Sequence, residues 1–339
     1  MFSNPSRTHT KWISITCLVV MLAVLVTGCA GPAPTPTAVP PKPAEPTKAP
    51  VAAPTAVPPT ATPKKAVVLK MARSMEPFSV LVPWMIDDNP AVFLSVNIYD
   101  TLLRVSKDGF SVEPGLASKW ESSADGLTWT FTLRDGLKFS DGTALKASDA
   151  KASLDMVRTG EKSITWKDSY AAIKEIQAPD DKTLKVILSQ PYAPILSTMA
   201  LFAGAVLPEA YAKSTEAKDF DPNTAWKTKG SGAYYCEGWK KGEVIVLKRN
   251  PYYWKGTPTV DEVRIEYIPD DNTRVLKLQG GEVDVIDFVP LSQIAALGAQ
   301  PNIKAQAFPI QQSTFIILNT AAKPLDDVKV RQALNYATD

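Results

Sequence analysis

The chain has 339 residues, which is enough to bury a sizeable core and exceeds one average domain. Its net charge is +2, but residues 66–339 hold 31 of the 37 Lys and Arg residues and 34 of the 35 Asp and Glu residues. This part is therefore slightly acidic and offers no basic stripe for nucleic acid. The only histidine is His9, so residues 66–339 have no imidazole for a Ser-His-Asp site, a Cys-His site or a metal ligand. We predict no cofactor, no bound metal and no nucleic-acid partner.

An apolar run over residues 12–26 follows two basic residues near the N-terminus. Its length suits the apolar core of a signal peptide and is short for a membrane-spanning helix. The run ends in Val26-Thr27-Gly28-Cys29, which resembles a lipobox. We therefore predict a lipoprotein signal peptide over residues 1–28, with Cys29 diacylated as the first residue of the mature protein. The alternative is an uncleaved transmembrane anchor, and both place the remaining chain outside the cytoplasmic membrane.

Residues 31–65 contain twelve of the chain's 29 prolines, in near-repeats with Ala, Thr and Val. Such a composition cannot bury a core and favours extended polyproline II structure. We predict a Pro/Ala/Thr-rich tether over residues 29–65. The alternative role for this segment is a ligand for proline-binding domains.

Hydrophobic patterns predict alternating strands and helices along the rest of the chain. The first helical pattern covers residues 92–104, where Val92, Val96, Tyr99 and Leu103 share one face. Ser148 and Asn272 are expected to cap later helices. The other expected strands cover residues 66–72, 172–176, 184–188, 244–247, 262–268 and 313–318, and the other expected helices cover residues 148–159, 194–201, 273–279 and 326–337.

Residues 115–149 form the most informative stretch, GLASKWESSADGLTWTFTLRDGLKFSDGTALKASD. From Leu127 to Arg134, apolar and polar residues alternate, as is typical of a half-buried strand. Three Asp-Gly pairs supply turns around this strand. The pattern predicts a small antiparallel meander that leads into a helix near Ser148, and taken alone this module carries no chemistry.

This stretch resembles the signature of the family 5 extracellular solute-binding proteins, the peptide, oligopeptide and nickel-binding proteins of ABC importers. Its Trp, Asp-Gly, Leu-Arg-Asp-Gly and Phe-Ser-Asp-Gly groups and its final Asp all fall in register with that signature. The glycines at 230 and 232 could instead indicate a phosphate loop, but no Lys-Ser or Lys-Thr pair follows them. Similar pieces elsewhere are Ser-Met-Glu-Pro at 74–77, Gly-Ser-Gly-Ala-Tyr-Tyr at 230–235, Arg-Asn-Pro-Tyr-Tyr-Trp at 249–254, Glu-Val-Asp-Val at 282–285 and the helical run at 326–337.

The resemblance implies an α/β fold of the periplasmic-binding-protein type II-like class, bilobal with an extra subdomain. Lobe I is expected to be discontinuous, built from residues 66–100 and 222–320, with an inserted subdomain at residues 101–221. Residues 321–339 would begin the second large lobe. Because the family continues well beyond this point, the chain is expected to be C-terminally truncated, with the second lobe mostly missing.

The resemblance also implies a ligand cleft between the lobes. Asn319 lies where relatives cross between lobes, and Ser74 lies in a loop that leads into the cleft. Trp84, Trp166 and Tyr170 are aromatic candidates for the cleft wall. Each aromatic residue has packing in the core as its alternative, and Asn319 has a plain strand-end hydrogen bond.

The expected function is that of a monomeric, lipid-anchored receptor on the extracytoplasmic face of the cell membrane. It would capture a solute, which in this family is most often a short peptide, and deliver it to an ABC permease complex without making or breaking a bond. A nickel complex or a sugar remains an open alternative for the cargo. Two other classes of function are an extracellular glycan-active lipoprotein using paired carboxylates and a structural surface lipoprotein. No Asp and Glu spacing singles out such a pair.

Overall fold

The computed structural model describes residues 66–78, 80–308 and 316–338. Cys29, the predicted signal peptide and the predicted tether lie outside the described residues. So do residues 313–315 of the strand expected at 313–318, and its described part, residues 316–318, has no regular secondary structure.

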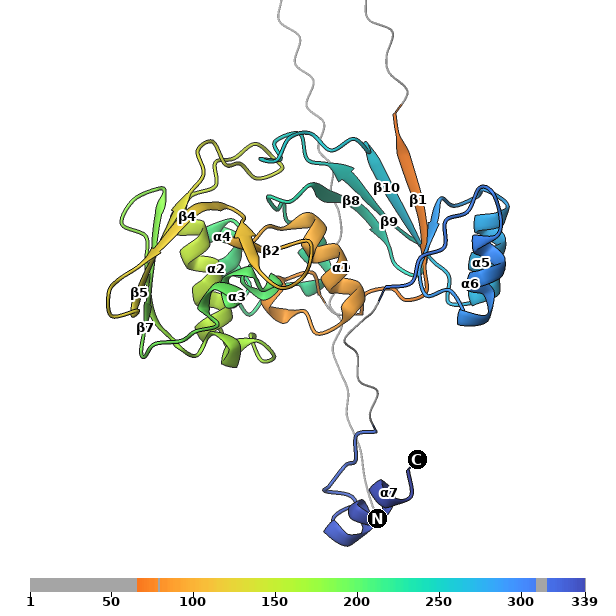
Figure 1. The fold of residues 1–339 in the computed structure, drawn as a ribbon. Helices are drawn as coiled ribbons and strands as arrows, with labels where there is room; N and C mark the ends of the chain where they lie inside the picture. The colour runs from red at the N-terminus through yellow and green to blue at the C-terminus, as the bar shows by residue number, and fades with distance from the viewer. Residues whose placement is uncertain (1–65, 79, 309–315, 339) are drawn as a thin grey trace, which may run out of the picture. The chain divides into compact units, whose positions relative to one another are not determined.

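A five-stranded sheet in the order β11-β1-β10-β9-β8 combines β1, near the start of the described chain, with strands from residues 234–286. β1 runs parallel to β10 and β11, whereas β9 runs antiparallel to β10 and β8. Figure 1 shows β1 beside β10, although about 190 residues separate them in the sequence, as in the pair formed by Val68 and Glu262. The carboxyl ends of β1, β10 and β11 therefore lie along one edge of this sheet. The strands are β1 (Val68–Arg73), β8 (Tyr234–Lys240), β9 (Val244–Arg249), β10 (Glu262–Tyr267) and β11 (Val285–Ile286).

A four-stranded antiparallel sheet in the order β4-β5-β7-β6 includes two strands, β4 and β5, from the informative stretch at residues 115–149. Phe131 and Leu133 of β5 are buried, which confirms the predicted alternation. The sequence places a short apolar piece, residues 137–139, next to this strand in the expected meander. That part of the expectation is wrong, because β7 pairs with β5 instead and contributes the buried Leu184 and Val186. The bounds are β4 (Ala117–Ser122), β5 (Thr128–Leu133), β6 (Ile173–Gln177) and β7 (Thr183–Leu188), and β2 (Leu103–Val105) pairs separately with β3 (Val112–Pro114).

Helix α1 (Asn89–Ile98) differs from the expected helix over residues 92–104. It begins earlier because Asp88 caps it by accepting a hydrogen bond from the Ala91 N–H at 2.8 Å. It ends earlier because Tyr99 is extended, and Leu103 belongs to β2. The expected face is also wrong, since Val96 is 53% exposed while Ala91, Leu94, Ser95 and Ile98 are buried.

Two helices begin at other N-cap residues than expected, because a carboxylate at the start of each helix makes the capping hydrogen bond. In α2 (Ala147–Thr159), Ser148 lies inside the helix, and the N-cap is Lys146, whose backbone N–H donates to Asp149 Oδ2 at 2.8 Å. In α5 (Asp271–Gln279), the cap is Asp270 rather than Asn272, and its Oδ1 accepts from the Thr273 N–H at 2.7 Å. The other helices are α3 (Ile195–Ala200), α4 (Glu209–Ser214), α6 (Leu291–Gly298) and α7 (Val328–Tyr336), with 3-10 helices η1 (Pro83–Met85), η2 (Lys167–Tyr170), η3 (Phe202–Gly204) and η4 (Pro222–Lys227).

The glycine pair before β8 permits close packing against the end of α1. A Cβ on Gly230 would lie 2.1 Å from the Ile98 carbonyl oxygen, and the Gly232 N–H donates to that oxygen at 2.9 Å. A strand follows these glycines, not a helix. The packing therefore accounts for the glycines without a phosphate loop.

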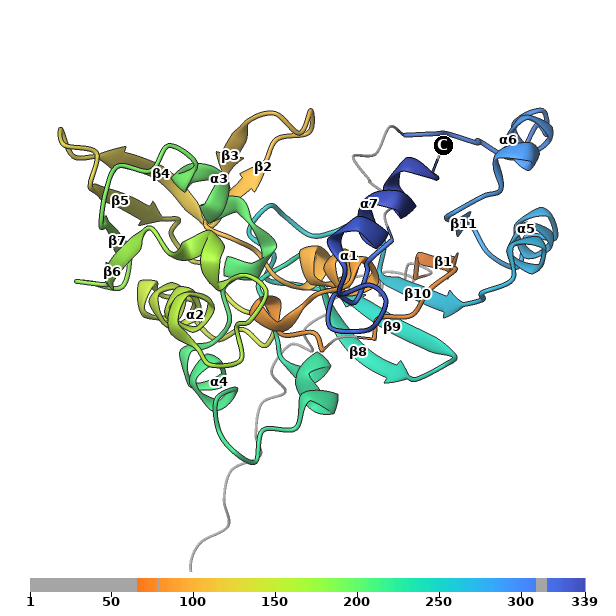
Figure 2. The same ribbon diagram turned by 90° about the horizontal axis from the view of Figure 1, so that it is seen from below.

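One hydrophobic core contains buried residues of both large sheets. Phe131 and Val186 contribute from the four-stranded sheet, and Ile245 and Ile265 contribute from the five-stranded sheet. Helix α2 packs against β6, β7 and α4, and α1 packs against β8; Figure 2 shows α2 beside α4. The same core thus supports the sheet edge where β1, β10 and β11 end.

Candidate functional site

The carboxyl ends of β1, β10 and β11 form the candidate site, which we call the strand-end edge (Arg73, Ser74, Tyr267, Asp287 and Phe288). Arg73 and Tyr267 end neighbouring strands in register, and Asp287 follows β11 directly. In open α/β sheets, ligands bind outside the carboxyl ends of parallel strands. The topology therefore places the loops most suited to ligand contact at this edge.

An ion pair lies at the centre of the strand-end edge. The Arg73 Nε donates to Asp287 Oδ2 at 2.6 Å, and the Ser74 backbone N–H donates to Asp287 Oδ1 at 3.2 Å. The Arg73 guanidinium also lies 4.0 Å from the centroid of the Phe93 ring on α1. The Arg73 side chain is only 11% exposed, so these contacts hold a charged pair in a fixed place.

Arg274 braces the loops that follow β10 and β11. This α5 residue is 1% exposed, and its NH1 donates to the carbonyl oxygens of Ile268 and Pro269 at 2.7 and 2.9 Å. Its NH2 donates to the carbonyl oxygen of Phe288 at 3.1 Å. Phe288 has φ of 50°, an unfavourable value for a bulky residue, and is 62% exposed. Arg274 therefore fixes the strained backbone of Phe288, and the exposed ring of this residue lies at the edge.

Glu76 fixes the loop that follows β1. Its Oε1 accepts a hydrogen bond from Trp239 Nε1 at 2.6 Å, and its Oε2 accepts from the Gly242 N–H at 2.9 Å.

Burial raises the pKa of the Tyr267 hydroxyl well above its ordinary value, so this group stays protonated at neutral pH. The edge consequently combines the ion pair of Arg73 and Asp287 with a neutral tyrosine hydroxyl.

Of the residues that the sequence nominated for the cleft, the three aromatic ones lie around η3, which contacts η1 and the side chains of Trp166 and Tyr170. Ser74 lies at the strand-end edge. Trp166 is partly buried, donates from Nε1 to the Ile86 carbonyl oxygen at 2.6 Å and packs edge-on against Phe202. Trp84 and Tyr170 are both 0% exposed. Asn319 is exposed, and its Oδ1 accepts from the Ala321 N–H at 3.1 Å.

Sequence reasoning missed Arg73, Asp287 and Arg274. Only one local signal marked any of them, namely a charged residue directly after a short apolar strand, as in Asp287 after β11. That signal does not reveal which strands become neighbours, so the ion pair could not be read from it.

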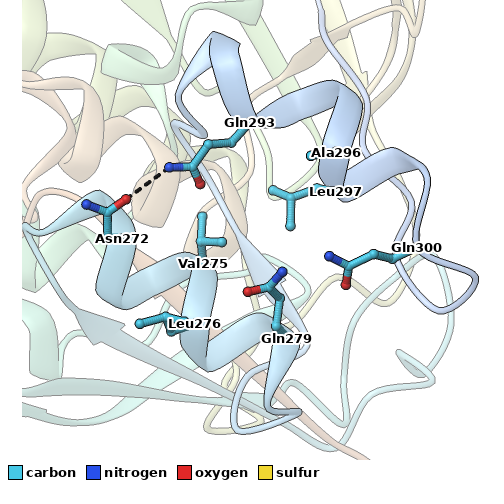
Figure 3. Close-up of a pocket in the computed structure, with 8 residues that line it drawn as sticks. All are labelled: Asn272, Val275, Leu276, Gln279, Gln293, Ala296, Leu297 and Gln300. Carbon is cyan, nitrogen blue, oxygen red and sulfur yellow. Dashed lines mark hydrogen bonds between the residues drawn. The ribbon is translucent and has the colours of Figure 1, made fainter.

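A cavity of about 350 Å³ lies between α5 and α6. Four neutral amides surround it, and Figure 3 shows the Gln293 side chain reaching across to Asn272, where Nε2 donates to Oδ1 at 2.9 Å. Its apolar lining includes Val275 and Leu297, which are nearly buried. The described residues that line it include no ionisable side chain. The cavity can therefore form hydrogen bonds with uncharged groups.

Within residues 66–78, 80–308 and 316–338, no group of three or more His, Cys, Asp or Glu side chains is arranged to hold a metal ion. Over the same ranges, no helix is both long and apolar enough to span a bilayer.

The arrangement of sheets and helices is shared with solved periplasmic binding proteins of the type II-like α/β fold. The ABC transporter-associated periplasmic binding protein DppA of Helicobacter pylori, solved in complex with the peptide STSA, is 29% identical with a TM-score of 0.63, covering 69% of this chain and 49% of that one. The mannopinic-acid complex of MoaA from A. tumefaciens R10 is 26% identical with a TM-score of 0.70, covering 81% of this chain and 56% of that one.

The sequence profile of the bacterial extracellular solute-binding proteins, family 5 Middle, matches residues 111–339, more than half of the chain. The chain belongs to this family. The probable D,D-dipeptide-binding periplasmic protein DdpA of Escherichia coli K12 is 32% identical over 284 residues, which is 82% of this chain and 54% of that protein. The chain spans about half the length of the curated relatives it matches.

Proposed function

We propose that the protein is an extracytoplasmic solute receptor that captures its ligand between two lobes and passes it to an ABC importer. The family match over residues 111–339 is the observation that carries this proposal. The strand-end edge supports it, because charged side chains and backbone loops converge there. Binding would favour the closed form that a permease recognises, and no covalent step is needed.

The proposed ligand surface uses part of the residues nominated from the sequence. Lobe I would comprise residues 66–100 and 222–320, with residues 101–221 as the inserted subdomain and residues 321–339 beginning the second lobe. Ser74, Trp166 and Asn319 have exposed or partly exposed side chains and would face the solute. Trp84 and Tyr170 would support the wall from inside, since burial favours the packing role for both.

A short peptide is the proposed cargo. Relatives named for a dipeptide and for a bound peptide support this class, and the mannopinic-acid complex supports opine-type conjugates as the second candidate. Both classes carry carboxylate and amide groups, which fixed charges and backbone N–H groups can bind.

Titration calorimetry of the full-length protein tests the proposal. The titrants are peptides of two to four residues, mannopinic acid and a Ni²⁺ salt. Saturable binding of peptides with no hydrolysis of the recovered peptide is expected. Tighter binding of mannopinic acid than of any peptide would reassign the cargo. Hydrolysis of oligosaccharides without binding of any of the three titrants would favour the glycan-active alternative and contradict the receptor function.

A lipid anchor at Cys29 is proposed with it. Cys29→Ser would remove the thiol that carries the diacylglycerol, so the protein should stay unprocessed or leave the membrane fraction. Cys17→Ser, within the expected signal peptide, serves as the control and should be processed normally. Radiolabelled lipid incorporation measures both variants, and equal labelling of Cys29→Ser and the unchanged protein would refute the anchor.

A further inference from the structure

A second cavity, of about 210 Å³, lies beside the C-terminal half of α1. Its lining includes Ser95, Val96, Arg104, Val105 and Phe202, from α1, β2 and the 3-10 helix η3 that follows α3. We call it the Arg104 pocket. Helix α3 packs against β2, which places these elements together (Figure 1).

Ser95 supplies the first indication of a ligand. Its side chain is 1% exposed, and its Oγ has no hydrogen-bond partner among the described residues. A buried hydroxyl without a partner is costly, and most such groups in folded proteins are satisfied. The other hydroxyls at the pocket are already used, because the Tyr99 OH donates to the Leu81 carbonyl oxygen at 3.0 Å and the Thr101 hydroxyl donates to the Leu103 carbonyl oxygen.

Arg104 supplies the second indication. Both hydrogen bonds of its guanidinium leave from Nη1, to Asp100 Oδ1 at 2.9 Å and to the Tyr253 hydroxyl at 3.0 Å. The second oxygen of Asp100 accepts from Trp254 Nε1 at 2.9 Å, so this buried carboxylate is occupied at both oxygens. In the described part of the chain, the N–H groups at Nε and Nη2 of Arg104 therefore have no acceptor, and the side chain is one-third exposed.

Asp100, whose two oxygens accept from Arg104 and Trp254, also lines the pocket, as does Tyr99, and the remaining lining is apolar. Val96 and Val105 are 53% and 56% exposed, and Phe202 and two alanines complete the lining. An arginine with free donors, an unpartnered hydroxyl and an apolar lining together suit a ligand that has an anionic acceptor group and a short hydrocarbon part.

We propose that the Arg104 pocket binds a small aliphatic carboxylate. The Nε and Nη2 groups of Arg104 hold the carboxylate, the Ser95 hydroxyl donates to it, and the hydrocarbon chain packs against Val96 and Phe202. This site does not rest on the solute-receptor function. Peptide binding elsewhere on the protein can fail while the pocket still binds its ligand.

Titration of the full chain with sodium butanoate at constant ionic strength tests the proposal, followed by ¹⁵N NMR, with butanamide as the uncharged isostere. Saturable shifts are expected for Ser95, Val96 and the Arg104 side-chain Nε, with butanamide binding at least tenfold more weakly. Ser95→Ala should weaken butanoate binding about tenfold, because it removes a hydrogen bond to a charged group. The folded state loses no internal hydrogen bond in this variant, so its melting temperature should not fall.

Ser231→Ala is the matched control, since Ser231 is equally buried and its Oγ also lacks a partner among the described residues, but it does not line the pocket. Its butanoate affinity should be unchanged. Val96→Phe narrows the pocket from an exposed position and should abolish binding. Absence of saturable binding, equal affinity for butanamide, or an unchanged affinity in Ser95→Ala would each overturn the proposal, as would equal weakening in Ser231→Ala.

Discussion

Cys236 lies in β8 with 1% of its surface exposed, and its Sγ lies 3.7 Å from the Gly238 carbonyl oxygen. Burial raises the pKa of its thiol to about 12. Because the thiolate is the reactive form, roughly one thiol in ten thousand is ionised at pH 8.

We therefore expect Cys236 to resist iodoacetamide at pH 8 in the folded protein and to react at once in 6 M guanidinium. Mass spectrometry of the Cys17→Ser, Cys29→Ser double variant measures this, because Cys236 is then the only thiol. Stoichiometric labelling without denaturant would contradict the burial of this residue.

Asp100 predicts a pH dependence of stability. Burial raises the pKa of its carboxyl above the ordinary value of 3.8, despite the hydrogen bond from Trp254 and the nearby charge of Arg104. The folded state then binds the Asp100 proton more tightly than the unfolded state does. The contribution of this group to stability falls as pH rises from 3.8 through the folded pKa and is constant above it.

The measurement is the free energy of unfolding in urea from pH 4 to pH 7, compared with that of Asp100→Asn. Relative to this variant, the unchanged protein should gain stability as the pH is lowered across the range. Asp100→Asn also disturbs Trp254 and Arg104, which changes stability at every pH. The test is therefore how the difference in free energy of unfolding between the two proteins changes with pH, not how large that difference is. A difference that shrinks toward low pH would mean that ion pairing outweighs burial at this site.

At the scale of the element, the approach of β8 to α1 depends on Gly230. A Cβ there would lie 2.1 Å from the Ile98 carbonyl oxygen and 2.5 Å from a ring carbon of Tyr99, so α1 or β8 must move. We expect Gly230→Ala to lower the free energy of unfolding by about 1–3 kcal/mol, the usual cost of overpacking.

Gly238→Ala is the control for this substitution. Gly238 lies within β8 itself, and an added Cβ would meet nothing within 4 Å. Its stability should change by no more than about 0.5 kcal/mol. Equal losses in both variants would show that any alanine in this region is harmful and would remove the argument from close packing.

Local sequence patterns predicted which helices and strands form better than where these elements end or which strands pair. The alternation in β5 was readable because one face of the strand is buried, whereas the end of α1 depended on Tyr99, whose hydroxyl donates to the Leu81 carbonyl oxygen 18 residues away. Ser74 was predicted to lie in a loop that leads into the ligand cleft, because its motif resembles the family, and this stays a prediction. Its ion-paired neighbours Arg73 and Asp287 are 214 residues apart, and the pairing of β1 with β11 that joins them has no local signature.

At the scale of the whole molecule, the five-stranded and the four-stranded sheets share one hydrophobic core. All described residues belong to one compact unit, and buried side chains from both large sheets contact one another through α1 and the helices around it. Contacts such as the Trp254 Nε1 bond to Asp100 join segments that are 154 residues apart in the sequence. A core of this kind favours a single cooperative unfolding transition over separate transitions for each sheet.

We therefore expect Ile265→Val, which removes one methyl group from a fully buried side chain of β10, to weaken the protection of both sheets against hydrogen exchange. The substitution should cost about 1 kcal/mol, which corresponds to roughly fivefold faster exchange of the amides that open only by global unfolding. Native-state hydrogen exchange measures the amides of β10 and β5 in one experiment. If unfolding is cooperative, the most protected amides of β5 should accelerate as much as those of β10, although Ile265 is not in their sheet. Acceleration confined to β10 and its neighbours would mean that the four-stranded sheet unfolds independently, and the common core would then be a packing contact between two separately stable parts.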